Sequence, residues 1–244
     1  MALTTLIAIT LLCILWSLWI RRVTWSCRWE VAATLNIALQ GLAVLLMSPL
    51  ASETLGHWLY SLTGKWNLED YLGHDAYIVA ASAVVYNTLG RLEEDHAMHR
   101  RFKQFVERPA TLCIPLLLAA FWLGNGASIY RPDFFDVPTD FWLNAYWLLL
   151  CGMLIYLLGY GSRALLILRS DPRSRQIATV YLFASFMGIT ACAVRVITAL
   201  VPSLQTVQSS TLVWIFACAC GAGFALSSAY SWRIKTKWFT RANS

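Results

Sequence analysis

Charged residues are scarce in this chain. Asp, Glu, Lys and Arg make up 13% of its 244 residues, against about 25% in ordinary soluble domains. Apolar residues reach 58%, and the mean hydropathy is +0.57. The net charge of +6 does not indicate binding to nucleic acid, because the basic residues occur in short clusters between apolar runs. This composition predicts an integral membrane protein.

Lysine and histidine are also rare, and their positions exclude several kinds of membrane chemistry. The last apolar run, 211–232, has no lysine that could form the Schiff base of a retinal protein. Haem sites and intramembrane serine proteases need histidines at membrane depth, and none is expected there. The histidines fall in loops or at the edge of a run, as His57, His74, His96 and His99.

A zinc hydrolase is the remaining enzyme to consider. Asp70, His74 and Asp75 are close in sequence, but such a site needs further ligands, and the last apolar run offers no histidine. The cysteines do not supply them, since we interpret them as small packing residues. All but Cys27 lie inside apolar runs. We therefore expect no enzymatic activity, no cofactor and no metal ion.

Seven apolar runs are predicted to be transmembrane helices. They cover residues 2–20, 29–50, 74–90, 110–123, 141–166, 177–201 and 211–232. The first positive charges, Arg21 and Arg22, follow the first run, whereas a signal peptide carries them before its apolar core. The sequence predicts an all-α polytopic protein whose seven helices form a single domain, with its N-terminus outside and its C-terminus cytoplasmic.

The distribution of Lys and Arg gives this orientation. Sixteen of them, counting Arg163 in the last turn of the fifth run, fall at the end of or after the first, third, fifth and seventh runs, and the other side has only Lys65 and Arg131. Loops rich in Lys and Arg stay in the cytoplasm. We expect the basic side to contact the anionic inner leaflet of a bacterial cytoplasmic membrane.

Two connecting segments are predicted to form short helices near the membrane surface. In residues 51–73, too polar to cross, Leu55, Trp58, Leu59 and Leu62 recur at helical spacing, which indicates an interfacial helix. Gly64 is expected to end it, and Asn67 to cap the next helix, with Asp70 and His74 as candidate residues of this outside region.

The second segment, 91–108, is the most charged of the chain. Met98, Phe102, Phe105 and Val106 follow a helical period, so we expect an amphipathic cytoplasmic helix that ends at Pro109. Its candidate contacts to anionic lipid or to a partner protein are His96, His99, Arg100 and Arg101. A metal site formed by these histidines with Glu93 and Asp95 is a weaker alternative, because no third fixed ligand is evident.

Arg195 is the feature around which the sixth run is organised. The positions at helical spacing from it are all small: Ala184, Gly188, Ala191, Thr198 and Ala199. Such a stripe lets another helix approach closely, so Arg195 is predicted to face the interior of the bundle. A charge there costs several kcal/mol unless it is paired or hydrated. We predict that Arg195 either pairs with Asp75 of the third run or extends toward the outside loops.

Other polar residues are predicted inside the membrane. Asn36 and Gln40 lie one turn apart in the second run, and Asn87 lies near the end of the third. Amides at such depth usually bond to neighbouring helices, and contact with a ligand or ion is the alternative.

The stretch SPLASETLGHWLYSLTGKWNLEDYLGHDAYIVAASAVVY resembles part of multi-pass membrane proteins of actinobacteria and their phages. The resemblance is carried by Gly64, Asn67, Leu68 and His74, which precede the next span. It implies a bacterial cytoplasmic membrane, and some members are labelled as transporters.

Two functions remain open from the sequence. In one, the protein is a transporter or channel for a small solute or ion, with polar residues across the membrane from Asn36, Gln40 and Asn87 to Asp75 and Arg195. In the other, it is a sensor, anchor or recruiting protein that acts through its outside loops or through segment 91–108. A homo-oligomer is compatible with both.

Overall fold

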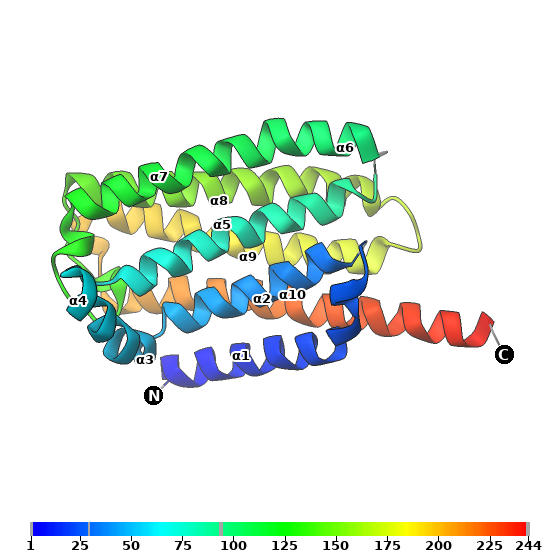
Figure 1. Cartoon of the computed structure of the whole chain (residues 1–244), viewed down its shortest axis with the longest axis horizontal. Coiled ribbons are helices and arrows are strands. Elements are labelled where there is room, and N and C mark those ends of the chain that lie inside the picture. The colour runs from blue at the N-terminus through cyan, green and yellow to red at the C-terminus, as the bar shows by residue number, and fades with distance from the viewer. Residues whose placement is uncertain (1, 29, 93–94, 243–244) are drawn as a thin grey trace.

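A computed structural model describes residues 2–28, 30–92 and 95–242, and this part of the chain is helical without strands (Figure 1). The long helices run along one axis, with the N-terminus at one end and the C-terminus at the other. They are α1 (Ala2–Ile20), α2 (Val31–Leu46), α5 (Leu68–Leu89), α7 (Arg108–Leu123), α8 (Phe141–Leu168), α9 (Arg175–Leu200) and α10 (Val207–Ala242). We call the end of the helix bundle that contains the N-terminus the Arg195 end, and we call the opposite end the Glu30 end.

Each predicted run falls on one of these helices, although Trp29, where the second run begins, lies outside the described residues. Among the described residues, five helices are long and apolar enough to cross a membrane: α1, the continuous helix 96–123, α8, α9 and α10. A sixth candidate is α2 joined to segment 49–63 across a bend of 60°. Helix α5 is not among them. It starts at Leu68 rather than at residue 74 and carries three carboxylates in its first eight residues. The count of seven spans stays a prediction.

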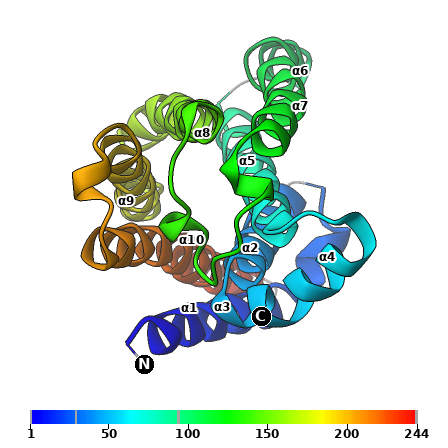
Figure 2. The same ribbon diagram turned by 90° about the vertical axis from the view of Figure 1, so that its left-hand side faces the viewer.

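Five helices form a closed ring, seen end-on in Figure 2: α2, α5, α8, α9 and α10 follow one another around a common axis. Helix α1 packs outside the ring against α2 and α10, and α7 packs outside it against α8 and α5. Most residues of α5 are buried, which explains how a helix of moderate hydropathy occupies the interior. Its polar side chains contact protein rather than lipid.

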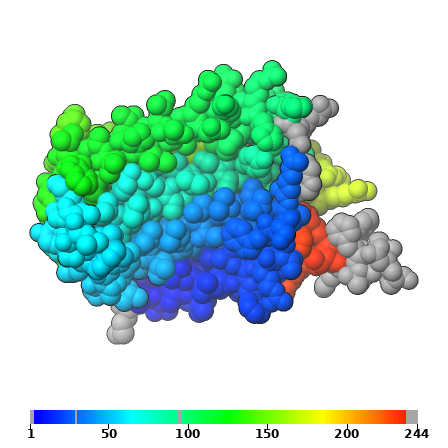
Figure 3. Space-filling model, in the orientation of Figure 1, coloured from blue at the N-terminus to red at the C-terminus, as the bar shows by residue number. Residues whose placement is uncertain are grey.

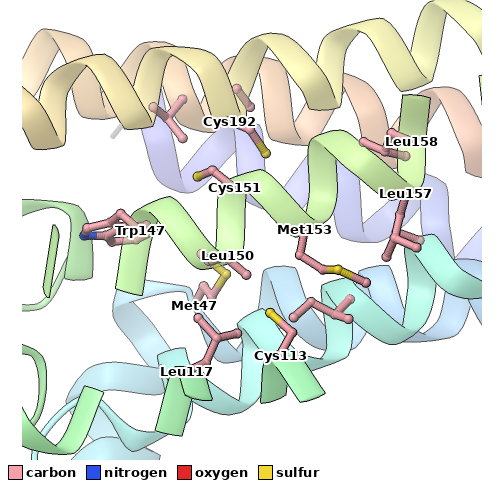
Figure 4. Packing of buried hydrophobic residues seen from close by; sticks show 14 of the residues in the cluster. Met47, Cys113, Leu117, Trp147, Leu150, Cys151, Met153, Leu157, Leu158 and Cys192 are labelled. Atoms are coloured by element: carbon pink, nitrogen blue, oxygen red, sulfur yellow. The ribbon is translucent and has the colours of Figure 1, made fainter. Parts of the chain in front are cut away.

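The interior between these helices is filled by aliphatic, aromatic and sulfur-containing side chains (Figure 4). Leu150 and Leu157 of α8 are almost fully buried, as is Leu117 of α7. Cysteines contribute to the same packing, since Cys113, Cys151 and Cys192 lie in this cluster, and all seven cysteines are free thiols. The interpretation as packing residues is confirmed for these three cysteines, whereas Cys13 and Cys27 are only partly buried and lie outside the cluster.

The segment after α2 folds over one side of the Arg195 end, where it is visible on the surface in Figure 3. It consists of α3 (Pro49–Ala51), a π-helical turn (Ser52–Gly56) and α4 (His57–Thr63). Gly64 ends α4 in the left-handed conformation, with φ of 66°. The predicted short helix and its end at Gly64 are therefore confirmed.

The predicted end of segment 91–108 is wrong. Helix α6 (Asp95–Phe102) runs through a π-helical turn (Lys103–Glu107) directly into α7. Pro109 lies in the first turn of α7, directly after the π-helical turn, and does not end the helix, although it removes one N–H donor from the helical hydrogen bonds. Met98 and Val106 of the apolar stripe are buried against the bundle, whereas Phe105 is 41% exposed.

Residues 124–140 cross the Arg195 end of the ring (Figure 2). This loop contains two short 3₁₀ helices, Asn125–Ala127 and Phe134–Asp136. Phe134 and Phe135 are buried among the helix ends. Asp140 then caps α8, because its Oδ1 accepts a hydrogen bond from the backbone N–H of Leu143 at 2.9 Å. The loop thus closes the ring at this end.

Candidate functional site

Arg195 lies in the interior of the bundle, as its small-residue stripe predicts. Its side chain is 3% exposed, and Ala184, Ala191 and Ala199 on the same face are equally buried. Phe186, which lies on another face of α9, is 60% exposed. The small residues leave space for α8 and α10 to pack closely on this face.

The guanidinium of Arg195 has few partners for a buried charge. Its Nη1 is 3.5 Å from the carbonyl oxygen of Phe135 and 3.4 Å from Oγ1 of Thr198, both long for hydrogen bonds. Its Nε and Nη2 have none. The group instead lies over the ring of Trp147, with Cζ 4.1 Å from the ring centroid. A cation–π contact of this kind stabilises the charge by about 2 kcal/mol when it is desolvated. It does not supply hydrogen-bond acceptors for Nε and Nη2 of Arg195, which remain unsatisfied.

The predicted pairing of Arg195 with Asp75 is wrong. No salt bridge in the described part of the chain joins them, and the carboxylates that act on Arg195 are Asp133 and Asp136 of the 124–140 loop. Asp133 itself is engaged elsewhere, since its Oδ2 accepts hydrogen bonds from Ser210 and from Trp214. Oδ1 of Asp75 is buried without a partner.

A group of polar side chains at the start of α5 was only partly anticipated. Asp70 and His74, which the sequence singles out, are 2% exposed. Glu69 is not among the candidates that the sequence indicates. It is completely buried, and neither of its carboxylate oxygens has a hydrogen-bond partner. Oε1 of Glu69 lies 2.5 Å from where a Cβ on Gly56 would be. Its burial therefore depends on the fold of segment 49–63 over α5, which no local pattern indicates.

His74 and Asn67 connect α5 to neighbouring segments. Nδ1 of His74 is 2.7 Å from the hydroxyl of Tyr146 in α8. Asn67 immediately precedes α5, as predicted, but its side chain does not cap the helix. Its Nδ2 instead donates to the carbonyl oxygens of Gly126 and Ile129, at 2.7 and 2.8 Å. The predicted role of Asn67 as an N-cap is wrong, because this side chain anchors the loop that closes the ring.

Arg195 and His74 both line a cavity of about 60 Å³ within the ring, which we call the outer cavity. Its wall also includes Tyr77 of α5, whose hydroxyl is buried without a partner, and the ring of Trp147. Of the described residues, those that line it include no carboxylate. A space of this size holds roughly four water molecules.

A second cavity, of about 80 Å³, lies farther along the same axis, and we call it the middle cavity. Tyr77, Leu154 and Ala191 line both spaces, so the two are neighbours. Gln40 contributes the amide of the middle cavity. Its Nε2 donates to Oδ1 of Asn36 at 2.7 Å, so the predicted bonding of these amides across to other helices is wrong for this pair.

Two aromatic rings separate the middle cavity from the Glu30 end. Phe224, which lines the middle cavity, is fully buried and meets Tyr181 edge-to-face at 5.2 Å. Tyr181 in turn lines a third cavity, of about 40 Å³, with Asn87 and Glu30. Of the predicted polar residues, Arg195, Gln40 and Asn87 each line one of the three cavities, whereas Asp75 and Asn36 line none of them. Side chains interrupt the path between Gln40 and Asn87.

The Glu30 end contains an ion-pair network that the sequence does not reveal. Arg21 is 1% exposed, and its Nη2 donates to Oε2 of Glu30 at 2.9 Å. Lys235 donates to Oε1 of the same carboxylate. The remaining nitrogens of Arg21 donate to Oγ1 of Thr34 and to the carbonyl oxygen of Ser228. Arg21 follows an apolar run, so the sequence suggests only a loop charge.

The carboxylate of Glu30 is stabilised in its ionised form. Burial raises the pKa of Glu30, but hydrogen bonds and charge from Lys235 and Arg21 outweigh it and hold the pKa below the usual 4.5. Arg91, at 3.8 Å from Oε1, adds a further positive charge. This end of the ring is therefore a satisfied electrostatic cluster rather than a reactive one.

The basic candidates on α6 remain at the surface. His96, His99, Arg100 and Arg101 are all exposed. His99 contacts Tyr86 of α5, with its Nε2 3.5 Å from the hydroxyl. Glu93, one ligand of the alternative metal site, lies outside the described residues. Among those described, no group of three metal-binding side chains is present.

Comparison with known proteins adds no relative, because no family model, no curated protein and no solved structure matches the chain. The site must therefore be interpreted from its own geometry.

Proposed function

We propose that this protein transports or conducts a small polar solute or ion across a membrane, along the axis of the five-helix ring. The observation that carries the proposal is the outer cavity, where a buried arginine with two unpartnered nitrogens lines a space large enough for a small ligand. If an arginine served only to connect two helices through hydrogen bonds, its N–H donors would be expected to have acceptors in those helices.

The order of the cavities supports transport rather than anchoring. The outer and middle cavities share part of their walls, and the third lies beyond one pair of aromatic rings. In this form the 124–140 loop closes one end and Tyr181 with Phe224 close the path farther in. A conformation in which the binding space is closed toward both ends is one of the states that a transporter passes through during alternating access.

We further propose that the Glu30 end is cytoplasmic, in a bacterial cytoplasmic membrane. Arg21, Arg91 and Arg169 to Arg175 gather at that end, and basic segments stay on the cytoplasmic side. Arg195 would then lie six residues before Val201, the residue that follows the end of α9, and about 9 Å inside the outer boundary. Anionic lipids of the inner leaflet would contact the basic surface of α6.

Native cysteines allow a direct test. Cys192 lines the outer cavity and Cys220 the middle one, whereas Cys113 is buried and lines neither. In liposomes, we expect a small hydrophilic thiol reagent such as silver ion to modify Cys192 and Cys220 in single-cysteine variants, and to spare Cys113. Equal protection of all three positions would contradict a hydrated path and favour the alternative, a sensor or recruiting protein.

Flux measurement completes the test. Liposomes containing the protein should release a small ion or solute faster than empty ones, in a panel of halide, nitrate, potassium, proton and glycerol. Arg195→Gln should lower that flux, whereas Arg163→Gln, which changes an exposed arginine of α8, should not.

A further inference from the structure

We infer that the outer cavity is a binding site for a small monovalent anion, held by the Nε and Nη2 edge of Arg195. The inference rests on the proposed function, because it names the class of substrate or co-substrate that would use the path. Binding can nevertheless be measured without flux.

The first argument is the identity of the free nitrogens. Nη1 of Arg195 is directed to Phe135 and Thr198, whereas Nε and Nη2 have no partner. Nε and Nη2 belong to one edge of the planar guanidinium, where two N–H groups lie parallel. That edge matches the two oxygens of a carboxylate or of nitrate. The pattern of satisfied and unsatisfied donors thus leaves the edge that recognises a planar anion.

The second argument is the chemistry of the cavity wall. Besides Arg195, its polar side chains are His74, Tyr77 and Trp147, all of which can donate hydrogen bonds. When the hydroxyl of Tyr146 donates to Nδ1 of His74, the ring proton lies on Nε2, which adds another donor. With these donors, the positive charge of Arg195 and no carboxylate among its lining residues, the cavity favours an anion over a hard cation such as sodium or potassium.

The third argument is charge balance. No ion pair in the described part of the chain involves Arg195, and Asp133 and Asp136 act on it only at longer range from the loop. A buried charge without a counterion in direct contact costs several kcal/mol. A monovalent anion in the adjoining space would remove part of that cost, and a neutral solute would not.

The size of the cavity limits the anion. A volume of about 60 Å³ accommodates roughly four water molecules, which corresponds to chloride, nitrate, formate or hydrogen carbonate. Larger anions such as gluconate would not fit without movement of the helices.

Isothermal titration of the full-length protein in an uncharged detergent tests the inference. Sodium nitrate, formate and chloride are each titrated into gluconate buffer at constant ionic strength. We expect saturable binding with one site per chain for at least one of them. Tighter binding of nitrate and formate would indicate an oxyanion ligand, and tighter binding of chloride a halide.

Two variants and a control make the result specific. Arg195→Gln should weaken binding about tenfold or more, because charged hydrogen bonds are lost, and Arg163→Gln should leave it unchanged. Ala191→Val keeps Arg195 but adds bulk to the cavity wall, and it should also weaken binding. This variant keeps the test valid if Arg195→Gln does not fold.

Absence of saturable binding in the wild-type protein would overturn the inference, as would binding that Arg195→Gln and Ala191→Val leave intact. These outcomes are distinct from failure of the proposed function. Binding without any flux would leave an anion-regulated membrane protein, and flux without anion binding would leave a transporter of another solute.

Discussion

Arg21 and Arg195 are similarly buried arginines at opposite ends of one helix ring, 1% and 3% exposed. Arg21 uses all three of its nitrogens, on Glu30, Thr34 and Ser228. Arg195 uses one, and weakly. Burial alone therefore does not distinguish a structural arginine from a functional one. The number of satisfied donors separates the two arginines, because a buried donor without a partner is a cost to the fold, and the proposed role of Arg195 would account for that cost.

The largest expected effect contrasts the two arginines directly. Arg21→Met leaves Glu30 with only its partly exposed partners, so the free energy of unfolding should fall by about 3 kcal/mol or more. Arg195→Met removes a charge that has no counterion and should change it by about 1 kcal/mol or less. Thermal unfolding in detergent measures both. The distinction fails if Arg195→Met is the more destabilising variant.

The next effect concerns how the Arg195 end is closed. Asn67→Gly keeps the left-handed backbone, where φ is 56°, but loses the two hydrogen bonds to the 124–140 loop. We expect a loss of about 2 kcal/mol and faster amide hydrogen exchange in that loop. Asn125→Ala is the matched control, because Asn125 makes one exposed bond, to Pro138, within the same loop. Equal exchange in both variants would argue against Asn67 as the anchor.

A smaller effect should appear with pH at the Glu30 end. Because the folded-state pKa of Glu30 lies below 4.5, its ionised form stabilises the fold above that pH. The contribution is lost as the pH falls through the lowered pKa. The difference in unfolding temperature between wild type and Glu30→Gln should therefore stay constant near neutral pH and shrink only once the pH falls below the usual value of 4.5. A difference that stays constant below this pH as well would mean that the carboxylate charge contributes nothing.

The smallest effect lies between the two ends, on the stripe that leads to Arg195. A Cβ on Gly188 would lie 2.8 Å from Cδ1 of Leu158 and 3.0 Å from Sγ of Cys220. Both atoms end side chains that can shift, so Gly188→Ala should cost about 1 kcal/mol. Gly152→Ala in α8 has nothing within 4 Å and should be neutral or slightly stabilising. Equal unfolding temperatures would show that the stripe is not tightly packed.

Local patterns anticipated much of the architecture. Each apolar run lies on a helix, and the small residues around Arg195 placed it in the interior before any contact was known. Gly64 ended its helix because only glycine adopts that conformation without strain. Asn67 marked the right position for a helix start, but its partners, Gly126 and Ile129, are too distant in sequence for any local rule.

The sequence by itself determined the helical class of this protein, the positions of its long helices and the inward direction of Arg195. Apolar length and helical period are properties of neighbouring residues. Only the tertiary structure decided which charges found partners. Arg21 meets Ser228 across 207 positions and Glu30 meets Lys235 across 205, whereas Arg195 forms no ion pair with any carboxylate that the structure describes. Such pairings depend on how the helices assemble around the ring, since residues distant in the chain become neighbours only there.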